Sequence, residues 1–343
     1  MSTPIAEYAM LSDRRTCALV SREGSVDWLC APRFDSPAVL GRLLDPAAGH
    51  WSVRPTDPDA EATRRYIDET MLIETTWTTA TGTATVTDAL TTGSTDDPHT
   101  LGAAAPRLLV RALECIGGEV EMGVEFAPRP EYGLVEPLMT VVEGGVVARG
   151  GADVVVLSCP APLEVSSATG SGRLRLAAGD RVLLGLQHRK TSEQWPVPLP
   201  AEELDDALCT TADAWRAWSR LHQNYRGPWR DLVHHSGRVL QALSYQPTGA
   251  VVAAATTSPP ARRLRSSAGA TCRSCSASAG STTSPSGPCR TWPGGAGADP
   301  SGSATAPGTS ARSTSTASCS ARHTGWLPNS TRITQGPPRG GSS

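Results

Sequence analysis

The sequence predicts a mainly β protein: a large antiparallel β-sandwich, followed by two helices and then by a disordered tail. Short aliphatic and β-branched runs recur between residues 16 and 186, separated by Gly, Pro and Asp clusters. Near residue 200 the apolar spacing changes to that of a helix. After Ser258 the chain is almost wholly Ser, Ala, Gly, Thr, Pro and Arg, which is too poor in large apolar side chains to build a core.

The first hairpin is predicted over residues 16–30. Gly24 supplies the permissive backbone that its turn needs, and Val26, Trp28 and Cys30 fall on one face by the period of two. A second hairpin, with β-branched residues on both arms, is predicted over residues 71–90. Further short strands are expected at residues 108–114, 120–126, 138–147, 154–158, 174–176 and 181–186. Many short strands joined by turns are typical of a sandwich.

Two helices follow the Pro-rich break at residues 196–200. The first is predicted over residues 201–221 and the second over residues 229–245. The apolar spacing of the second helix predicts a buried side that contains Leu232, Val233, Leu240 and Leu243. Three tryptophans, Trp215, Trp218 and Trp229, have the spacing of core or interdomain packing rather than of sugar-stacking platforms. These patterns divide the chain into residues 1–200, a β-sandwich, residues 201–258, a helical segment, and residues 259–343, the tail.

Charge and composition narrow the class of protein. The tail carries about eight net positive charges and the first 258 residues about ten negative ones, so the globular body is not expected to bind nucleic acid. The N-terminus has neither the basic nor the apolar region of a signal peptide, and no run is long enough to span a bilayer. A cytoplasmic protein without membrane partners is therefore expected. Five cysteines stand singly among apolar residues and predict buried, reduced thiols: Cys17, Cys30, Cys115, Cys159 and Cys209.

Several segments resemble a known family. They are residues 5–13 (IAEYAMLSD), 15–30 (RTCALVSREGSVDWLC) and 32–44 (PRFDSPAVLGRLL), with weaker similarity at 86–88, 128–133, the helix from Trp229, and 245–258. These segments are similar to the N-terminal, trehalase-like domain of bacterial glycoside hydrolase family 15, which includes glucoamylase-like and trehalase-like enzymes. The resemblance covers about three quarters of the chain.

The resemblance implies a β-sandwich packed on an (α/α) barrel that the two helices would begin. In such enzymes two barrel glutamates hydrolyse an α-glucosidic bond with inversion, one as general acid and the other as the base that activates water. The last glutamate of this chain is Glu203, so no catalytic residue can be assigned. Where the family implies an Asn-Trp-Asp-Tyr-Arg-Tyr segment, residues 259–265 read PPARRLR. The resemblance therefore implies a truncated hydrolase, inactive as written.

A shifted reading frame is one hypothesis for the tail. Taking the third base of each codon with the first two of the next, residues 294–306 can be read as WRGxRPVRIGNGA and residues 313–320 as DVYGELL. Both strings resemble a part of the family's catalytic domain. The hypothesis places the loss of frame near residue 258.

One loop is a candidate for substrate or interdomain contact. Arg33, Phe34 and Asp35 lie between prolines directly after a predicted strand, where polar residues are often functional. The alternative is a loop stabilised by its own salt bridge. No metal site and no cofactor are predicted, since the cysteines around Cys272 are irregularly spaced and His234 and His235 project about a hundred degrees apart on a helix.

Two functions remain open. The first is an enzyme-derived accessory domain, with a small carbohydrate as partner only where a catalytic domain is present. The second is a carbohydrate-binding or interaction module with a basic tail. In the first case an uncovered helical face is expected to favour self-association.

Overall fold

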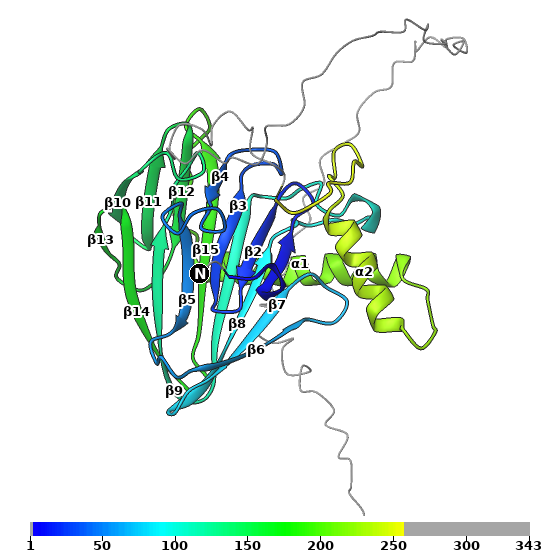
Figure 1. Cartoon of the computed structure of the whole chain (residues 1–343), viewed down its shortest axis with the longest axis horizontal. Coiled ribbons are helices and arrows are strands. Elements are labelled where there is room, and N and C mark those ends of the chain that lie inside the picture. Colours follow the sequence, from blue (N-terminus) through cyan, green and yellow to red (C-terminus); the bar gives the residue numbers. More distant parts are fainter. Residues whose placement is uncertain (1–2, 257–343) are drawn as a thin grey trace, which may run out of the picture. The chain divides into compact units, whose positions relative to one another are not determined.

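The computed structural model describes residues 3–256, which form two antiparallel β-sheets packed face to face and two α-helices (Figure 1). The first sheet contains β1 (Tyr8–Ser12), β2 (Cys17–Ser21), β3 (Ser25–Cys30), β4 (Ala38–Leu40), β5 (His50–Pro55), β13 (Glu164–Ser166) and β14 (Thr169–Ala177). The second contains β6 (Glu61–Tyr66), β7 (Ile73–Thr78), β8 (Gly82–Leu90), β10 (Leu138–Val142), β11 (Gly145–Gly150), β12 (Asp153–Ser158) and β15 (Arg181–Lys190). The prediction of a mainly β, antiparallel sandwich is confirmed.

One long strand, β9 (Leu108–Ala127), belongs to both sheets. Its first half pairs with β8 and β15 in the second sheet, and its second half pairs with β5 and β14 in the first. Gly118, with a positive φ of 70°, stands where the strand changes sheets. A strand that passes from one sheet to the other forms a corner of a sandwich. The sequence predicts two separate strands here, at 108–114 and 120–126, because the glycines at the corner resemble a turn.

The two predicted hairpins are confirmed. β2 and β3 pair through Ala18 and Leu29, with the turn at Gly24, and β7 pairs with β8 over the whole length of β7. Several short strands, among them β1, β5 and β6, were not predicted from the sequence. β5 has the period of two, with Trp51, Val53 and Pro55 buried, and the prediction missed it. β1 is nearly continuous in apolar residues and β6 is mostly polar, so neither shows apolar alternation in its sequence.

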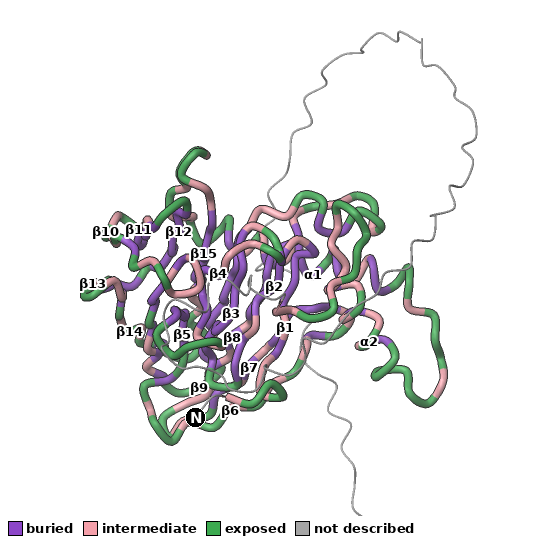
Figure 2. The backbone as a smooth tube through the Cα atoms, turned by 45° about the horizontal axis from the view of Figure 1, so that its top comes forward, coloured by how far each residue is buried: buried purple, intermediate pink, exposed green. Residues whose placement is uncertain are grey.

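The second sheet is covered on both faces. This explains why the first half of β9 is nearly continuous in apolar residues. Leu109 and Leu113 point into the sandwich core, whereas Leu108 and Val110 belong to a second core beneath the helix α1 (Ala201–His222). A strand buried on both faces does not alternate between apolar and polar residues. Figure 2 shows buried positions along the central strands and exposed ones at β10, β13 and α2 (Arg230–Ala242).

The tryptophans of the helical segment differ in burial. Trp215 and Trp218 are buried in the core beneath α1, as predicted, and their rings meet edge to face. Trp229 is 67% exposed, at the N-cap of α2. Trp229 is therefore not part of the core of residues 3–256, and its packing against another domain stays a prediction.

The predicted buried side of α2 is wrong. Leu232 and Leu240 are 64% and 60% exposed, and the helix is docked by the opposite side, through His234, Arg238 and Ala242. Polar contacts explain this orientation, because Ser12 donates to the Ala242 carbonyl at 2.7 Å and Arg238 donates to Gln223 at 3.0 Å. Apolar spacing alone cannot tell which neighbour a helix face meets.

Four of the five dispersed cysteines are free and buried, as predicted: Cys17, Cys30, Cys115 and Cys159. Cys209 is only half-buried on α1 and is disulfide-bonded, so the prediction of a buried, reduced thiol is wrong there. The predicted disordered tail, and the cysteines around Cys272 within it, lie outside the described residues.

Candidate functional site

The loop after β3 begins with a cis peptide bond between Ala31 and Pro32. It is tied to the neighbouring loop by the backbone N–H of Phe34, which donates to the carbonyl of Arg15 at 2.9 Å, and is closed by the N–H of Ser36, which donates to the carbonyl of Arg33 at 3.1 Å. Proline and these two backbone bonds restrict the loop, so the side chains it presents are held in defined directions.

Arg33 and Asp35 lie on the surface and pair with each other. Arg33 Nε donates to Asp35 Oδ1 at 2.8 Å, and Arg33 Nη2 donates to Asp35 Oδ2. The pairing raises the pKa of Arg33 and lowers the pKa of Asp35. Because both side chains are more than half exposed, the pair contributes little to stability. Both groups are accessible to a ligand or to another domain.

Phe34 points the opposite way. It is 3% exposed and belongs to a buried cluster with Cys17, Trp28 and Cys30. Its ring meets the ring of Tyr245 edge to face, with the centroids 6.4 Å apart. The three predicted site residues therefore divide by role: Phe34 anchors the loop, and Arg33 and Asp35 face solvent.

Tyr245 connects the loop to the segment that follows α2. The Arg33 guanidinium lies 5.8 Å from the centroid of the Tyr245 ring, a cation–π arrangement. The backbone of the same segment is fixed by the N–H of Gln246, which donates to the Arg14 carbonyl at 2.8 Å, and by the Cys17 thiol, which donates to the Ala255 carbonyl at 3.1 Å. The sequence indicated residues 245–258 only by their family resemblance, and no spacing pattern links Tyr245 to the loop.

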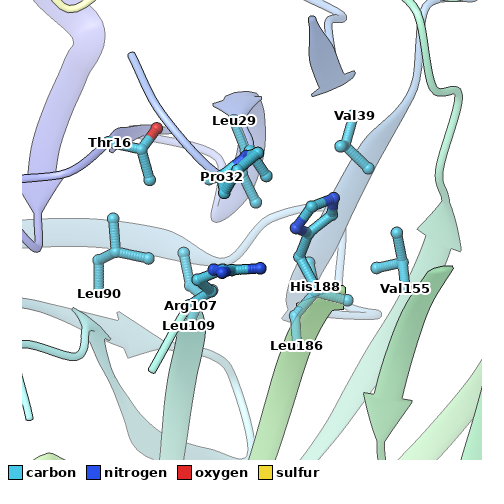
Figure 3. A pocket seen from close by; sticks show the side chains of 11 residues that line it. Thr16, Leu29, Pro32, Val39, Leu90, Arg107, Leu109, Val155, Leu186 and His188 are labelled. Carbon is cyan, nitrogen blue, oxygen red and sulfur yellow. The ribbon is translucent and has the colours of Figure 1, made fainter. Parts of the chain in front are cut away.

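A second feature lies inside the sandwich, beneath the cis-proline. Figure 3 shows a cavity bounded by Pro32, Val39, Leu186 and His188, with the guanidinium of Arg107 extending toward the imidazole. The cavity holds about 20 Å³, the space of one water-sized molecule. It is too small for a sugar ring.

Most polar groups at this cavity have partners outside it, while the buried His188 Nδ1 has no hydrogen-bond partner among the described residues. His188 Nε2 lies 2.7 Å from Asp153 Oδ1, and Lys190 Nζ lies 2.6 Å from the same oxygen. Burial lowers the pKa of His188, although the Asp153 carboxylate opposes this. Arg107 is bound to Glu193 at 2.8 Å. This cluster ties β12 to β15 and holds the end of the sheet together.

The adjacent histidines of α2 do not share a ligand. His234 is buried, whereas His235 packs against the ring of Tyr66, with centroids 4.8 Å apart. Among residues 3–256, no group of three His, Cys, Asp or Glu side chains is arranged to hold a metal ion. No helix within that range is long and apolar enough to cross a membrane.

Comparison with known proteins identifies the family to which the chain belongs. The family model described as "Trehalase-like, N-terminal" matches residues 1–175, just over half of the chain, and the chain belongs to this family. It is 35% identical over 274 residues to the trehalase of Mycolicibacterium smegmatis and 34% identical to the trehalase of Mycobacterium tuberculosis. Each alignment covers 75% of this chain and 40% of the relative. "Trehalase 1" of Sulfolobus acidocaldarius is 28% identical over 250 residues, 71% of this chain and 38% of that protein.

The chain therefore spans about 40% of the length of these curated relatives. The family resemblance stated from the sequence is confirmed for the N-terminal domain, and the protein is related to trehalase-like glycoside hydrolases.

Proposed function

We propose that residues 3–256 are the accessory domain of a family 15 glycoside hydrolase that cleaves α-glucosidic bonds, and that the polypeptide as written is catalytically silent. The observation that carries the proposal is the extent of the match: trehalases align with this chain over 40% of their own length. Inverting glycosidases need two carboxylic groups on opposite sides of the scissile bond. No glutamate follows Glu203 in these 343 residues, so none of them can be assigned to the two catalytic roles in a barrel.

The surface of α2 supports this proposal. Trp229, Leu232 and Leu240 are each at least 60% exposed on one short stretch of chain. Large exposed apolar side chains that gather in one region mark an interaction surface. A helical catalytic domain is the kind of neighbour that would cover them, and the exposed Arg33 and Asp35 would then contact that domain or its substrate.

We further propose that the reading frame is shifted near residue 258. The support is the abrupt change to Arg, Ser, Ala, Gly and Pro after the last segment that resembles the family. Sequencing the gene around this codon tests it directly. If no single shift of frame yields a sequence that resembles a helical barrel, the hypothesis is wrong.

The decisive activity experiment compares two polypeptides. The chain as written is expected to release no glucose from trehalose or maltose above the buffer rate, while a frame-restored version is expected to hydrolyse at least one of them. The M. smegmatis trehalase serves as the positive control. Measurable glucose release by the pure chain as written would overturn the proposal of a silent accessory domain.

A binding experiment separates the second candidate. An accessory domain without its catalytic partner is expected to show no saturable heat in calorimetric titration with trehalose or with soluble glucans. Saturable binding would instead favour a carbohydrate-binding module.

In the frame-restored enzyme, Arg33→Ala and Asp35→Ala are expected to lower activity if the loop faces the catalytic domain. Arg65→Ala on β6 is the control.

A cytoplasmic location completes the proposal and is supported by the four buried free thiols.

A further inference from the structure

The hairpin of β2 and β3 brings two cysteines together, one on each strand. The strands are antiparallel, and Leu19 pairs with Trp28 and Ala18 with Leu29. The same register places Cys17 opposite Cys30 at the next position. Thr16 keeps the strand ends together, because its hydroxyl donates to the Cys30 carbonyl at 2.5 Å.

Both thiols point to the same face. Residues that are directly opposite in an antiparallel pair project to one side of the sheet. Cys17 and Cys30 are each 1% exposed and share one buried cluster with Trp28 and Phe34. Burial, and then the neighbouring Cys30 thiol, raise the pKa of Cys17 well above its ordinary value. The two sulfurs are therefore neighbours as well as opposite in register.

The distance between opposed residues of two antiparallel strands allows a disulfide, but only a strained one. Opposed residues in an antiparallel pair have Cα atoms about 4.5 or 5.5 Å apart, which is inside the range that a disulfide spans. Their Cβ atoms are about 4.5 to 5.5 Å apart, whereas a disulfide prefers about 3.8 Å. The strands must draw together when the bond forms. A strained disulfide is more easily reduced than a structural one, and such bonds are the labile or regulatory ones.

Cys17 also has a contact that oxidation would remove. Its thiol donates to the carbonyl of Ala255, and Val252 and Ala255 pack on the cysteine cluster. The same segment carries Tyr245, which contacts Phe34 and Arg33. The oxidation state of the pair is thereby connected to how residues 245–256, which follow α2, pack on the cysteine cluster.

We propose that Cys17 and Cys30 are a reversible oxidation site, converted to a cross-strand disulfide by a low-molecular-weight disulfide such as oxidised glutathione. The thiolate of one cysteine attacks a sulfur of the external disulfide and expels one thiolate. The thiolate of the second cysteine then attacks the mixed disulfide and expels the other. Two electrons pass to the external disulfide, and the two protons of the cysteines end on the two released thiols. Because the pair is buried, the reaction requires the segment around Ala255 to open first.

The test uses the whole purified chain in glutathione buffers of graded redox potential, followed by alkylation and digestion. Trypsin cleaves after Arg15, Arg22 and Arg33, so Cys17 and Cys30 fall on different peptides, each with a single cysteine. A disulfide-linked pair of these peptides is expected under oxidising conditions, and it should disappear after addition of dithiothreitol. Cys115→Ser, at a buried thiol outside the pair, should leave the linkage unchanged.

Hydrogen exchange tests the connection to the following segment. Oxidation should speed exchange at residues 250–256 roughly fivefold, the effect of losing about one hydrogen bond. Cys17→Ser keeps a hydroxyl donor for the Ala255 carbonyl and cannot form the disulfide, so its exchange should not respond to oxidant, and Cys30→Ser serves as the second variant. The proposal is wrong if the native protein yields only mixed disulfides with glutathione, if Cys17 or Cys30 links to other cysteines instead, or if the linkage forms only in urea. Linkage without faster exchange would overturn the connection to Ala255.

Discussion

Asp88 and Arg111 stand directly opposite each other on β8 and β9 and form an ion pair that is closed off from solvent. Arg111 Nε donates to Asp88 Oδ1 at 2.8 Å, and Nη2 donates to Asp88 Oδ2 at 3.2 Å. The guanidinium also crosses the sandwich, since it donates to the carbonyls of Trp51 and Gly24 in the first sheet at 3.1 and 2.8 Å. This one side chain therefore joins the two sheets, and all its bonds are needed to offset the cost of its burial.

Removing one partner of this pair should be strongly destabilising. Asp88→Ala leaves a buried, unpaired guanidinium and should lower the free energy of unfolding by about 3 to 5 kcal/mol. Urea denaturation followed by tryptophan fluorescence measures the change. The matched control is Arg65→Ala, which breaks another directly opposed pair, Arg65 and Glu74 on β6 and β7, at an exposed position. Its denaturation midpoint should hardly move, and equal effects of the two substitutions would contradict the assigned role of Asp88.

The stability of the protein should depend on the ionisation of Asp13. This carboxyl group is fully buried in the turn between β1 and β2, and burial raises its pKa to about 6, although the backbone N–H groups of Thr16 and Arg15 oppose the shift. A folded pKa above the unfolded value means that the native state binds the extra proton. The stabilisation is therefore fully present below about pH 4 and is lost as the pH rises through about 6.

Asp13→Asn keeps an oxygen acceptor for the two backbone N–H groups and cannot ionise. The difference in unfolding free energy between the variant and the parent chain should grow in favour of the variant by about 2 kcal/mol between pH 4 and pH 7. Urea denaturation at several pH values gives this difference and cancels the titration of other groups. A difference that is constant with pH would show that Asp13 does not titrate in this range.

The exposed side of α2 should govern self-association. Replacing Leu232 and Leu240 with Glu adds charge at two exposed positions without removing any buried group, so the chain should become more nearly monomeric at high concentration. Light scattering coupled to size exclusion measures the molar mass. Leu138→Glu on β10 is the matched control, because Leu138 is 63% exposed at the edge of the second sheet. The same mass in all three proteins would rule out association through α2.

The docking of α1 should depend on Trp215. This side chain is fully buried between α1 and the second sheet, so Trp215→Ala should cost about 3 to 5 kcal/mol. Faster proteolysis within residues 201–222 and an earlier urea midpoint are the expected results. Trp229→Ala is the control, because this indole is exposed and its loss should leave both measurements unchanged. Resistance of Trp215→Ala to protease equal to that of the parent chain would contradict this account of α1.

Much of the fold can be predicted from local patterns. The hairpins around Gly24 and Gly82 have β-branched arms and turn residues, and both are observed. The predicted division at the glycines near residue 118 was wrong, because a corner within one strand uses the same residue as a turn between two. Of the candidate loop, sequence could indicate Arg33, Phe34 and Asp35 together. It could not show that Phe34 is an anchor, since that depends on Tyr245, which is more than two hundred residues away.

The sequence alone determined that this protein is a β-sandwich with two helices, that it resembles trehalase-like N-terminal domains, and that no glutamate follows Glu203. These properties follow from local periodicity, from short motifs and from which residue types are present. Only the tertiary structure decided which face of α2 is buried, which carbonyls Arg111 reaches, and that Phe34 meets the ring of Tyr245. Such relationships arise from strand register and helix docking, which are set by contacts between segments that no window of sequence contains.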